Sequence, residues 1–247
     1  MPDLSIIIAP LIAGMLVIAT HVPLGREVLR RGIIFIDLAV AQIAGLGVII
    51  ALALEMEIGG YGVQLAAGIS ALLGGLFLQW SESRWPDIQE AIIGIVFILA
   101  ACTSLLLLAG EPHGIQHLQD LLVGQILWVR FDQLPEAAVL FTIVFLAWVF
   151  ARSFATGKGF YLLFALAVTA SVQLVGIYLV FASLIIPALA IRQLGARRGL
   201  AVGLGIGVSS YLAGLLLSIM TDLPAAPLIV WSLACFSLVV AWLGRAR

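Results

Sequence analysis

Residues 160–191 read FYLLFALAVTASVQLVGIYLVFASLIIPALAI and contain no charged side chain. An α-helix crosses the hydrocarbon core of a membrane in about 17–25 residues. As a single helix this stretch would be roughly 48 Å long, which is more than one crossing needs. Gly176 and Pro187 both allow a helix to break. We therefore expect two membrane-spanning helices here, at about 160–176 and 177–192.

The rest of the chain contains further apolar segments of similar length. They lie near 5–22, 38–54, 61–79, 90–109, 135–151, 200–219 and 226–243. Of the 247 residues, 63% are hydrophobic and 10% are charged, with a mean hydropathy of +1.21, whereas a soluble domain is about a quarter charged. We predict an all-α integral membrane protein, a polytopic bundle of about nine transmembrane helices, with eight as the alternative. Residues 1–247 are expected to form a single transmembrane domain.

The distribution of positive charge tests this helix count, because cytoplasmic loops of membrane proteins are enriched in lysine and arginine. With nine crossings and the N-terminus outside, only Arg130 among the twelve basic residues falls outside. The others are Arg26, Arg30, Arg31, Arg84, Arg152, Lys158, Arg192, Arg197, Arg198, Arg245 and Arg247. We therefore expect a multi-pass protein of the cell (inner) membrane with a cytoplasmic C-terminus, in which Arg26, Arg30 and Arg31 lie in the first cytoplasmic loop.

The composition argues against several other classes of function. A net charge of −1 provides no basic surface for nucleic acid. Cys102 and Cys235 both lie in apolar segments, so the sequence has no disulfide framework and no CxxC metal motif. It also has no GxxxxGK[ST] motif, nucleophile elbow or HExxH motif. We expect no enzymatic activity and no cofactor in this chain, so ATP, if it drives the protein, is used by a partner subunit.

Asp37 is an acidic residue at the start of an apolar segment, six residues after Arg31. If the intervening chain is helical, Asp37 lies roughly 9 Å deeper in the membrane than Arg31. An ionised aspartate at mid-bilayer costs about 2.5–3.5 kcal/mol, so a passing cation is one reason to retain it. Capping of backbone amides, or an ion pair with Arg30 or Arg31, explains it equally well. Asp37 is thus a candidate metal ligand in a transport pathway, with the structural role left open.

Other polar residues are weaker candidates. Gln42 lies five positions after Asp37, about 140° around a helix, and is a second pathway candidate, although interhelical hydrogen bonding is the commoner role of such a glutamine. His113 and His117 are four residues apart, which would place two imidazoles on one helical face as metal ligands. Ordinary solvated loop histidines explain the same spacing more often. His21 is expected at the membrane boundary, at the end of the first helix.

Three glycines provide a packing signal. Gly199, Gly203 and Gly207 recur every four residues and therefore lie on one face of a helix. Small residues at this spacing allow a second helix to approach closely. We expect this face to pack against another helix of the bundle.

Five groups of residues then occur in a characteristic order along the chain. They are VLRR (28–31) leading into FID (35–37), EAIIGIVF (90–97), DLLVGQIL (120–127), VGIYLVFASLIIPALA (175–190), and GLLLS (214–218) followed by DLP (222–224). In this order they resemble the zinc/manganese-type family of ABC transporter permeases, the membrane subunits of divalent-metal importers. The resemblance covers most of the chain.

The resemblance implies the permease subunit of an ATP-driven importer, with a type II ABC importer-like fold, for a divalent transition metal ion such as zinc, manganese or iron. Implied partners are a second copy of the chain, a separate ABC ATPase subunit and an extracytoplasmic substrate-binding protein. Arg30, Arg31, Arg152 and Lys158 become candidates for ATPase contact, with a purely topology-setting role as the alternative. Two features differ from the family. Ala41 stands where such permeases carry a histidine, and only residues 152–159 are available for the coupling helix after the fifth span.

Two rival functions remain open at the level of the sequence. An ion-gradient-driven secondary transporter would also be a polytopic helix bundle, but such proteins commonly contain inverted repeats, and we find no convincing internal repeat. A permease for a metal chelate, such as a siderophore or cobalamin, would share related architecture. Association with a Walker-motif ATPase distinguishes the first rival from an ABC permease.

Overall fold

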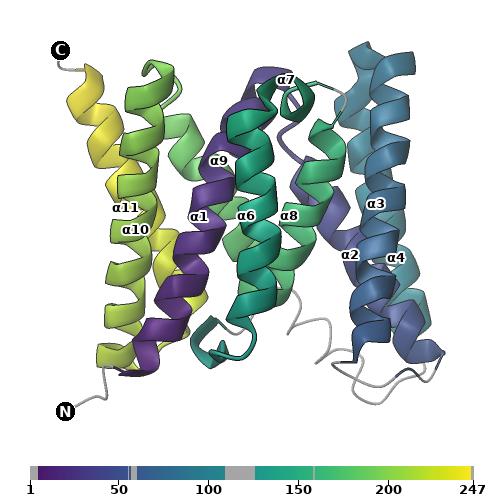
Figure 1. Ribbon diagram of the computed structural model, residues 1–247, viewed down its shortest axis with the longest axis horizontal. Coiled ribbons are helices and arrows are strands. Elements are labelled where there is room, and N and C mark those ends of the chain that lie inside the picture. The colour runs from purple at the N-terminus through teal and green to yellow at the C-terminus, as the bar shows by residue number, and fades with distance from the viewer. Residues whose placement is uncertain (1–4, 55, 57–59, 109–125, 158, 246–247) are drawn as a thin grey trace.

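The computed structural model describes residues 5–54, 56, 60–108, 126–157 and 159–245, and all regular structure in this part of the chain is helical. Figure 1 labels the α-helices. They are α1 (Ser5–Arg31), α2 (Ile36–Ala53), α3 (Tyr61–Arg84), α4 (Gln89–Leu108), α6 (Leu134–Phe150), α7 (Arg152–Ala155), α8 (Phe160–Val175), α9 (Ile177–Ala190), α10 (Ala196–Thr221) and α11 (Ala225–Arg245). Short 3-10 turns at Pro86–Ile88 and Ile126–Trp128 precede α4 and α6.

Six helices are long and apolar enough to cross a membrane: α1, α2, α3, α10, α11, and α4 with its preceding turn. Helices α6, α8 and α9 are apolar but shorter. The predicted division of residues 160–191 is confirmed, because α8 ends at Val175 and α9 begins at Ile177. Gly176 between them has φ 80° and ψ 162°, a conformation that is essentially restricted to glycine. The sequence therefore encodes the break at one residue.

The first helix is longer than expected. The sequence predicts a span of 5–22, whereas α1 continues through Pro23 to Arg31. Its polar residues do not end it, because the Thr20 hydroxyl and the His21 Nδ1 both bond the Val17 carbonyl within the helix, at 3.0 and 2.9 Å. The prediction that His21 lies at the end of the first helix is therefore wrong, since α1 continues ten residues beyond it, and the side chain is fully buried within the bundle. Likewise the three arginines expected in the first loop lie in the last two turns of α1.

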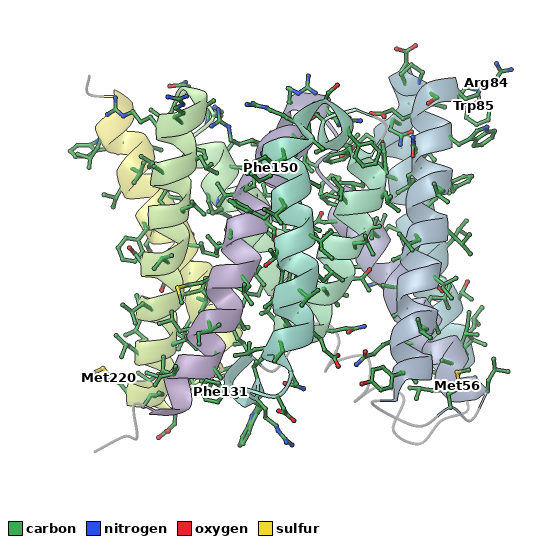
Figure 2. The ribbon with its side chains drawn as sticks, viewed as in Figure 1. Met56, Arg84, Trp85, Phe131, Phe150 and Met220 are labelled. Atoms are coloured by element: carbon green, nitrogen blue, oxygen red, sulfur yellow. The ribbon has the colours of Figure 1, made fainter. Side chains whose placement is uncertain are left out.

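The helices run between two ends of the molecule. In Figure 1 the N-terminus lies at the lower end and the C-terminus at the upper end. Figure 2 shows Arg84 and Phe150, at the ends of α3 and α6, at the upper end, and Met56 and Met220, beside the ends of α2 and α10, at the lower end. We call the upper end, where α1 ends and α10 begins, the arginine-rich end.

The basic residues separate between these ends as the sequence predicts. The arginines of the α1 terminus, the α3 terminus, α7 and the α9–α10 connection lie at the arginine-rich end. Arg130 lies at the opposite end, next to Phe131, and pairs with Asp132 at 2.8 Å. Lys158 is outside the described residues.

Helix α1 runs through the middle of the bundle and contacts α6, α8, α9 and α10. The predicted glycine face is confirmed. A Cβ at Gly203 would lie 2.7 Å from Val22, and one at Gly207 would lie 2.5 Å from Ile18, so α10 packs on α1 through these glycines. Gly25 of α1 similarly lies against the Leu184 carbonyl of α9. On the other side, α2 packs between α3 and α4. Close helix contacts thus hold α1 in the core.

Candidate functional site

The site is built around the connection between α1 and α2. Gly32 has φ +71°, and its N–H donates to the Leu29 carbonyl while the Ile33 N–H donates to the Val28 carbonyl, both at 3.3 Å. This pattern is a Schellman motif, in which glycine closes the C-terminus of a helix. Arg31 and Asp37 are therefore not joined by continuous helix, and the expected 9 Å offset between them does not apply.

Asp37 lies in the first turn of α2 and is only 1% exposed. Among the described residues, neither carboxylate oxygen has a hydrogen-bond partner. The arginines that the sequence suggested as partners instead bind Glu27: Arg30 in a bidentate pair, and Arg31 through Nε at 3.0 Å. The helix dipole favours an acid in the first turn, but no observed ion pair compensates its burial.

Glu90 lies beside this carboxylate and was not predicted as a site residue. It is in the first turn of α4, and its Oε1 accepts a hydrogen bond from the Phe35 N–H at 3.3 Å. Its Oε2 is buried without a partner in the described structure. This hydrogen bond holds Glu90 at the start of α2, two residues before Asp37. The sequence could have identified Glu90 as a candidate, because Glu90, like Asp37, is an acidic residue at the start of an apolar segment.

The start of α2 is also in contact with α9. The rings of Phe35 and Phe181 stack at 6.5 Å between centroids, with planes 4° apart. The two carboxylates thus lie where α2 meets α4, beside a helix that follows the Gly176 break. Helix α9 therefore contacts the chain two residues before Asp37.

The other predicted ligands do not gather here. Gln42 is 8% exposed and lies further along α2, on a different face from Asp37, while Ala41 fills the position one turn after Asp37. His113 and His117 lie outside the described residues. His21 is buried with Nε2 unpartnered in the described structure. Within the residues that are described, no cluster of three His, Cys, Asp or Glu side chains could hold a metal.

Arg31 connects several elements at the arginine-rich end. Its guanidinium bonds Glu27 of α1, Glu82 of α3 at 2.9 Å and the Thr156 carbonyl after α7 at 2.8 Å. It also lies over the Phe160 ring of α8, 4.3 Å from the centroid. Its side chain is 13% exposed. These contacts favour a structural role for Arg31 over contact with an ATPase.

Arg30 and Arg152 face outward. The Arg30 side chain is 65% exposed although it pairs with Glu27, and Arg152 begins α7, a single helical turn between α6 and α8. This turn occupies the segment that the sequence left for an abbreviated coupling helix. Both arginines are accessible to another protein at this end.

Chemically, Asp37 and Glu90 offer buried carboxylate oxygens that no other side chain of the described structure bonds, with Glu90 Oε1 held by the Phe35 N–H. Burying a charge without compensation is strongly unfavourable. A divalent cation would compensate the charge of these acids and use the free oxygens as ligands. Two side chains supply fewer ligands than a closed metal site requires, so the arrangement suits a transient binding site better than a permanent one.

Comparison with known proteins agrees with this description. A family model described as the ABC 3 transport family matches residues 3–156 and 155–244. No curated protein matches the chain. Among solved structures, the chain is similar to PsaBC from Streptococcus pneumoniae in complex with Fab, with 20% identity, a TM-score of 0.75, and coverage of 95% of this chain and 90% of that one. It is also similar to an inward-facing metal-chelate type ABC transporter, with 16% identity, a TM-score of 0.64, and 94% and 86% coverage.

Proposed function

The chain belongs to the ABC 3 transport family, and we propose that it is the permease subunit of an ATP-driven importer for a divalent transition metal ion, with Asp37 in the pathway. Membership in this family makes it a membrane component of an ABC transporter rather than an enzyme. The metal that is carried, the direction of transport and the role of Asp37 go beyond family membership and are proposed here.

The observation that carries the proposal is the state of the Asp37 carboxylate. It is buried inside a membrane protein, no side chain of the described structure bonds it, and a second acid, Glu90, bonds the backbone two residues before it. Ionisable groups in membrane segments that lack a structural partner commonly mark ion pathways. A metal cation passing the start of α2 would satisfy both carboxylates in turn.

The donor chemistry narrows the choice of metal. Asp37 and Glu90 supply oxygen ligands, and Ala41 stands where an imidazole would add nitrogen. Carboxylate sites suit manganese, whereas imidazole and thiolate ligands suit zinc. We therefore expect manganese to be carried in preference to zinc, with iron between them. A chelate is the second candidate, because the chain also resembles a metal-chelate type transporter.

We further propose the assembly in which this permease works. Nine crossings, in a type II importer arrangement with the N-terminus outside, place the arginine-rich end in the cytoplasm, in agreement with the positive-inside rule. Two copies would pair and bind two ATPase subunits at this end, where Arg30 and Arg152 are accessible. A substrate-binding protein would deliver the metal to the opposite end. ATP-driven closure of the ATPases would then move α9 and α10 relative to α2.

Substitution of Asp37 tests the proposal. Asp37→Asn keeps the side-chain size and removes the charge, so uptake of radioactive manganese into cells should fall by roughly 10- to 100-fold, the effect of losing a contact to a charged group. Membrane abundance, measured by immunoblot, should not change. The matched control is Asp132→Asn, which neutralises an exposed carboxylate at the end of the molecule and should leave uptake unaltered.

The result also separates the alternatives. Wild-type uptake by Asp37→Asn at normal abundance would contradict a pathway role for Asp37. Uptake of a siderophore complex but not of free manganese by the wild type would identify the cargo as a chelate.

A further inference from the structure

A cavity of about 880 Å³ lies at the arginine-rich end, between the ends of α1, α6, α9 and α10. Its volume is in the range of about 300–1,000 Å³ that small-molecule sites occupy. The charged residues that line it are five arginines and one glutamate: Arg26, Arg30, Arg152, Arg192, Arg197 and Glu27. The cavity is therefore strongly basic, although the chain as a whole has a net charge of −1.

The single acid does not neutralise this cavity. Glu27 is engaged by Arg30 and by Arg31, which faces the interior of the bundle. Arg26 donates to the Leu194 and Ala196 carbonyls at 3.0 and 3.1 Å, and so holds the α9–α10 connection against α1. Within the described residues, Arg152 and Arg197 form no side-chain hydrogen bond or ion pair. Their charges remain available to a ligand.

Apolar side chains also line the cavity. Pro23 lines it and lies eight residues before the end of α1, which is about 12 Å along the helix axis. Trp148, near the end of α6, lines it as well, and tryptophan is typical of the membrane–water interface. The lining thus combines arginines with apolar side chains, the two kinds of surface that a phospholipid needs.

We propose that this cavity binds the headgroup of an anionic phospholipid. Its phosphodiester would face Arg192 and Arg197, and its acyl chains would contact the apolar side chains of the lining. Basic pockets between membrane helices bind cardiolipin and related headgroups by this combination of charge and apolar surface. A lipid bound there would join the ends of four helices at the point where α9 connects to α10. This goes beyond the proposed transport function and does not depend on which metal is carried.

The test is lipid binding by the full-length chain purified in a zwitterionic detergent. Cardiolipin at saturating concentration should raise the Tm by about 5–10 °C, and native mass spectrometry should detect one retained lipid per chain. Phosphatidylcholine and inorganic phosphate should do neither. Arg192→Gln/Arg197→Gln should weaken cardiolipin binding by about 30-fold. The matched control, Arg84→Gln/Arg198→Gln, removes two arginines from the same end without altering the cavity lining, and should bind as the wild type does.

A second variant keeps the test valid if the double substitution impairs folding. Ala196→Phe leaves every charge in place and introduces a ring at the cavity lining, so it should also weaken cardiolipin binding. Equal loss of binding in both double variants would indicate non-specific attraction and would overturn the proposal. Binding of inorganic phosphate with the affinity of cardiolipin would identify a free-anion site instead. Loss of ATPase co-purification in Arg192→Gln/Arg197→Gln, with no lipid bound to the wild type, would assign the cavity to the ATPase.

Discussion

Arg31 shows how one side chain can link several helices of a membrane protein. Its guanidinium contacts α1 and α3 through Glu27 and Glu82, and reaches the segment after α7 through the Thr156 carbonyl. A planar guanidinium with five donors makes such divergent contacts, whereas a lysine ammonium on a flexible stem does not. Removing it would leave Glu82 without an ion-pair partner among the described residues, and Glu27 with Arg30 alone.

We predict that Arg31→Gln lowers the free energy of unfolding by about 3–5 kcal/mol, the effect of removing one partner from a largely buried charge cluster. Thermal unfolding in detergent measures this change. Arg130→Gln is the control, because the Arg130–Asp132 pair is 75% and 61% exposed and surface pairs contribute about 0–1 kcal/mol. Equal destabilisation by both variants would refute the bridging role.

Only part of the candidate site could be predicted from the amino-acid sequence. Asp37 stands out in the sequence because an acid in an apolar run is unfavourable unless it has a function or a partner. Its suggested partners, Arg30 and Arg31, are close in sequence but bind Glu27, because glutamate three or four positions earlier on the same helix is within reach. Glu90 approaches Asp37 only through packing of α4 on α2, which no local pattern encodes.

At the scale of helices, the break between α8 and α9 depends on a single backbone conformation. Gly176 at φ 80° and ψ 162° ends α8 and redirects the chain into α9. Other residues adopt this region at a cost of about 1–3 kcal/mol. The break is therefore a fixed feature of the fold that another residue at this position would strain.

We expect Gly176→Ala to destabilise the protein by about 1–3 kcal/mol, again measured by thermal unfolding in detergent. Gly205→Ala provides the comparison, because Gly205 lies inside α10 with open space around it, where alanine favours helix by roughly 0.5–1 kcal/mol. The two substitutions should thus shift stability in opposite directions. Destabilisation by Gly205→Ala as large as that by Gly176→Ala would contradict the conformational argument.

Apolar length and glycine spacing predicted most helices to within a few residues. Examples are α8 and α9, and the packing of α10 on α1 through Gly203 and Gly207. The end of α1 was not predicted, because Thr20, His21 and Pro23 form a polar interruption in the sequence. In the structure, the side chains of Thr20 and His21 are satisfied by the helix's own Val17 carbonyl. The sequence shows these three residues, but whether the helix continues through them depends on hydrogen bonds that the sequence does not show.

At the scale of the molecule, the separation of arginines between two ends predicts the orientation in the membrane. Eight of the described arginines outside the C-terminal tail belong to the arginine-rich end, and Arg130 to the other. From this asymmetry we predict that the arginine-rich end faces the cytoplasm. The asymmetry could be predicted from the sequence, because successive membrane-spanning helices place successive loops on alternate sides of the membrane.

Cysteine labelling in intact cells checks this orientation. In a background without Cys102 and Cys235, a membrane-impermeant maleimide should label Asp132→Cys directly and Arg84→Cys only after permeabilisation. Both side chains are exposed, so access rather than burial determines the result. The reverse pattern would place the arginine-rich end outside and contradict the proposed direction of transport.

The most direct test of the whole account is manganese transport by the purified permease in proteoliposomes, with and without the ABC ATPase proposed as its partner. The account predicts accumulation of manganese only when the ATPase and ATP are both present, and its loss when the ATPase carries an inactive Walker motif. Accumulation by the permease alone, driven by a proton or sodium gradient, would contradict it.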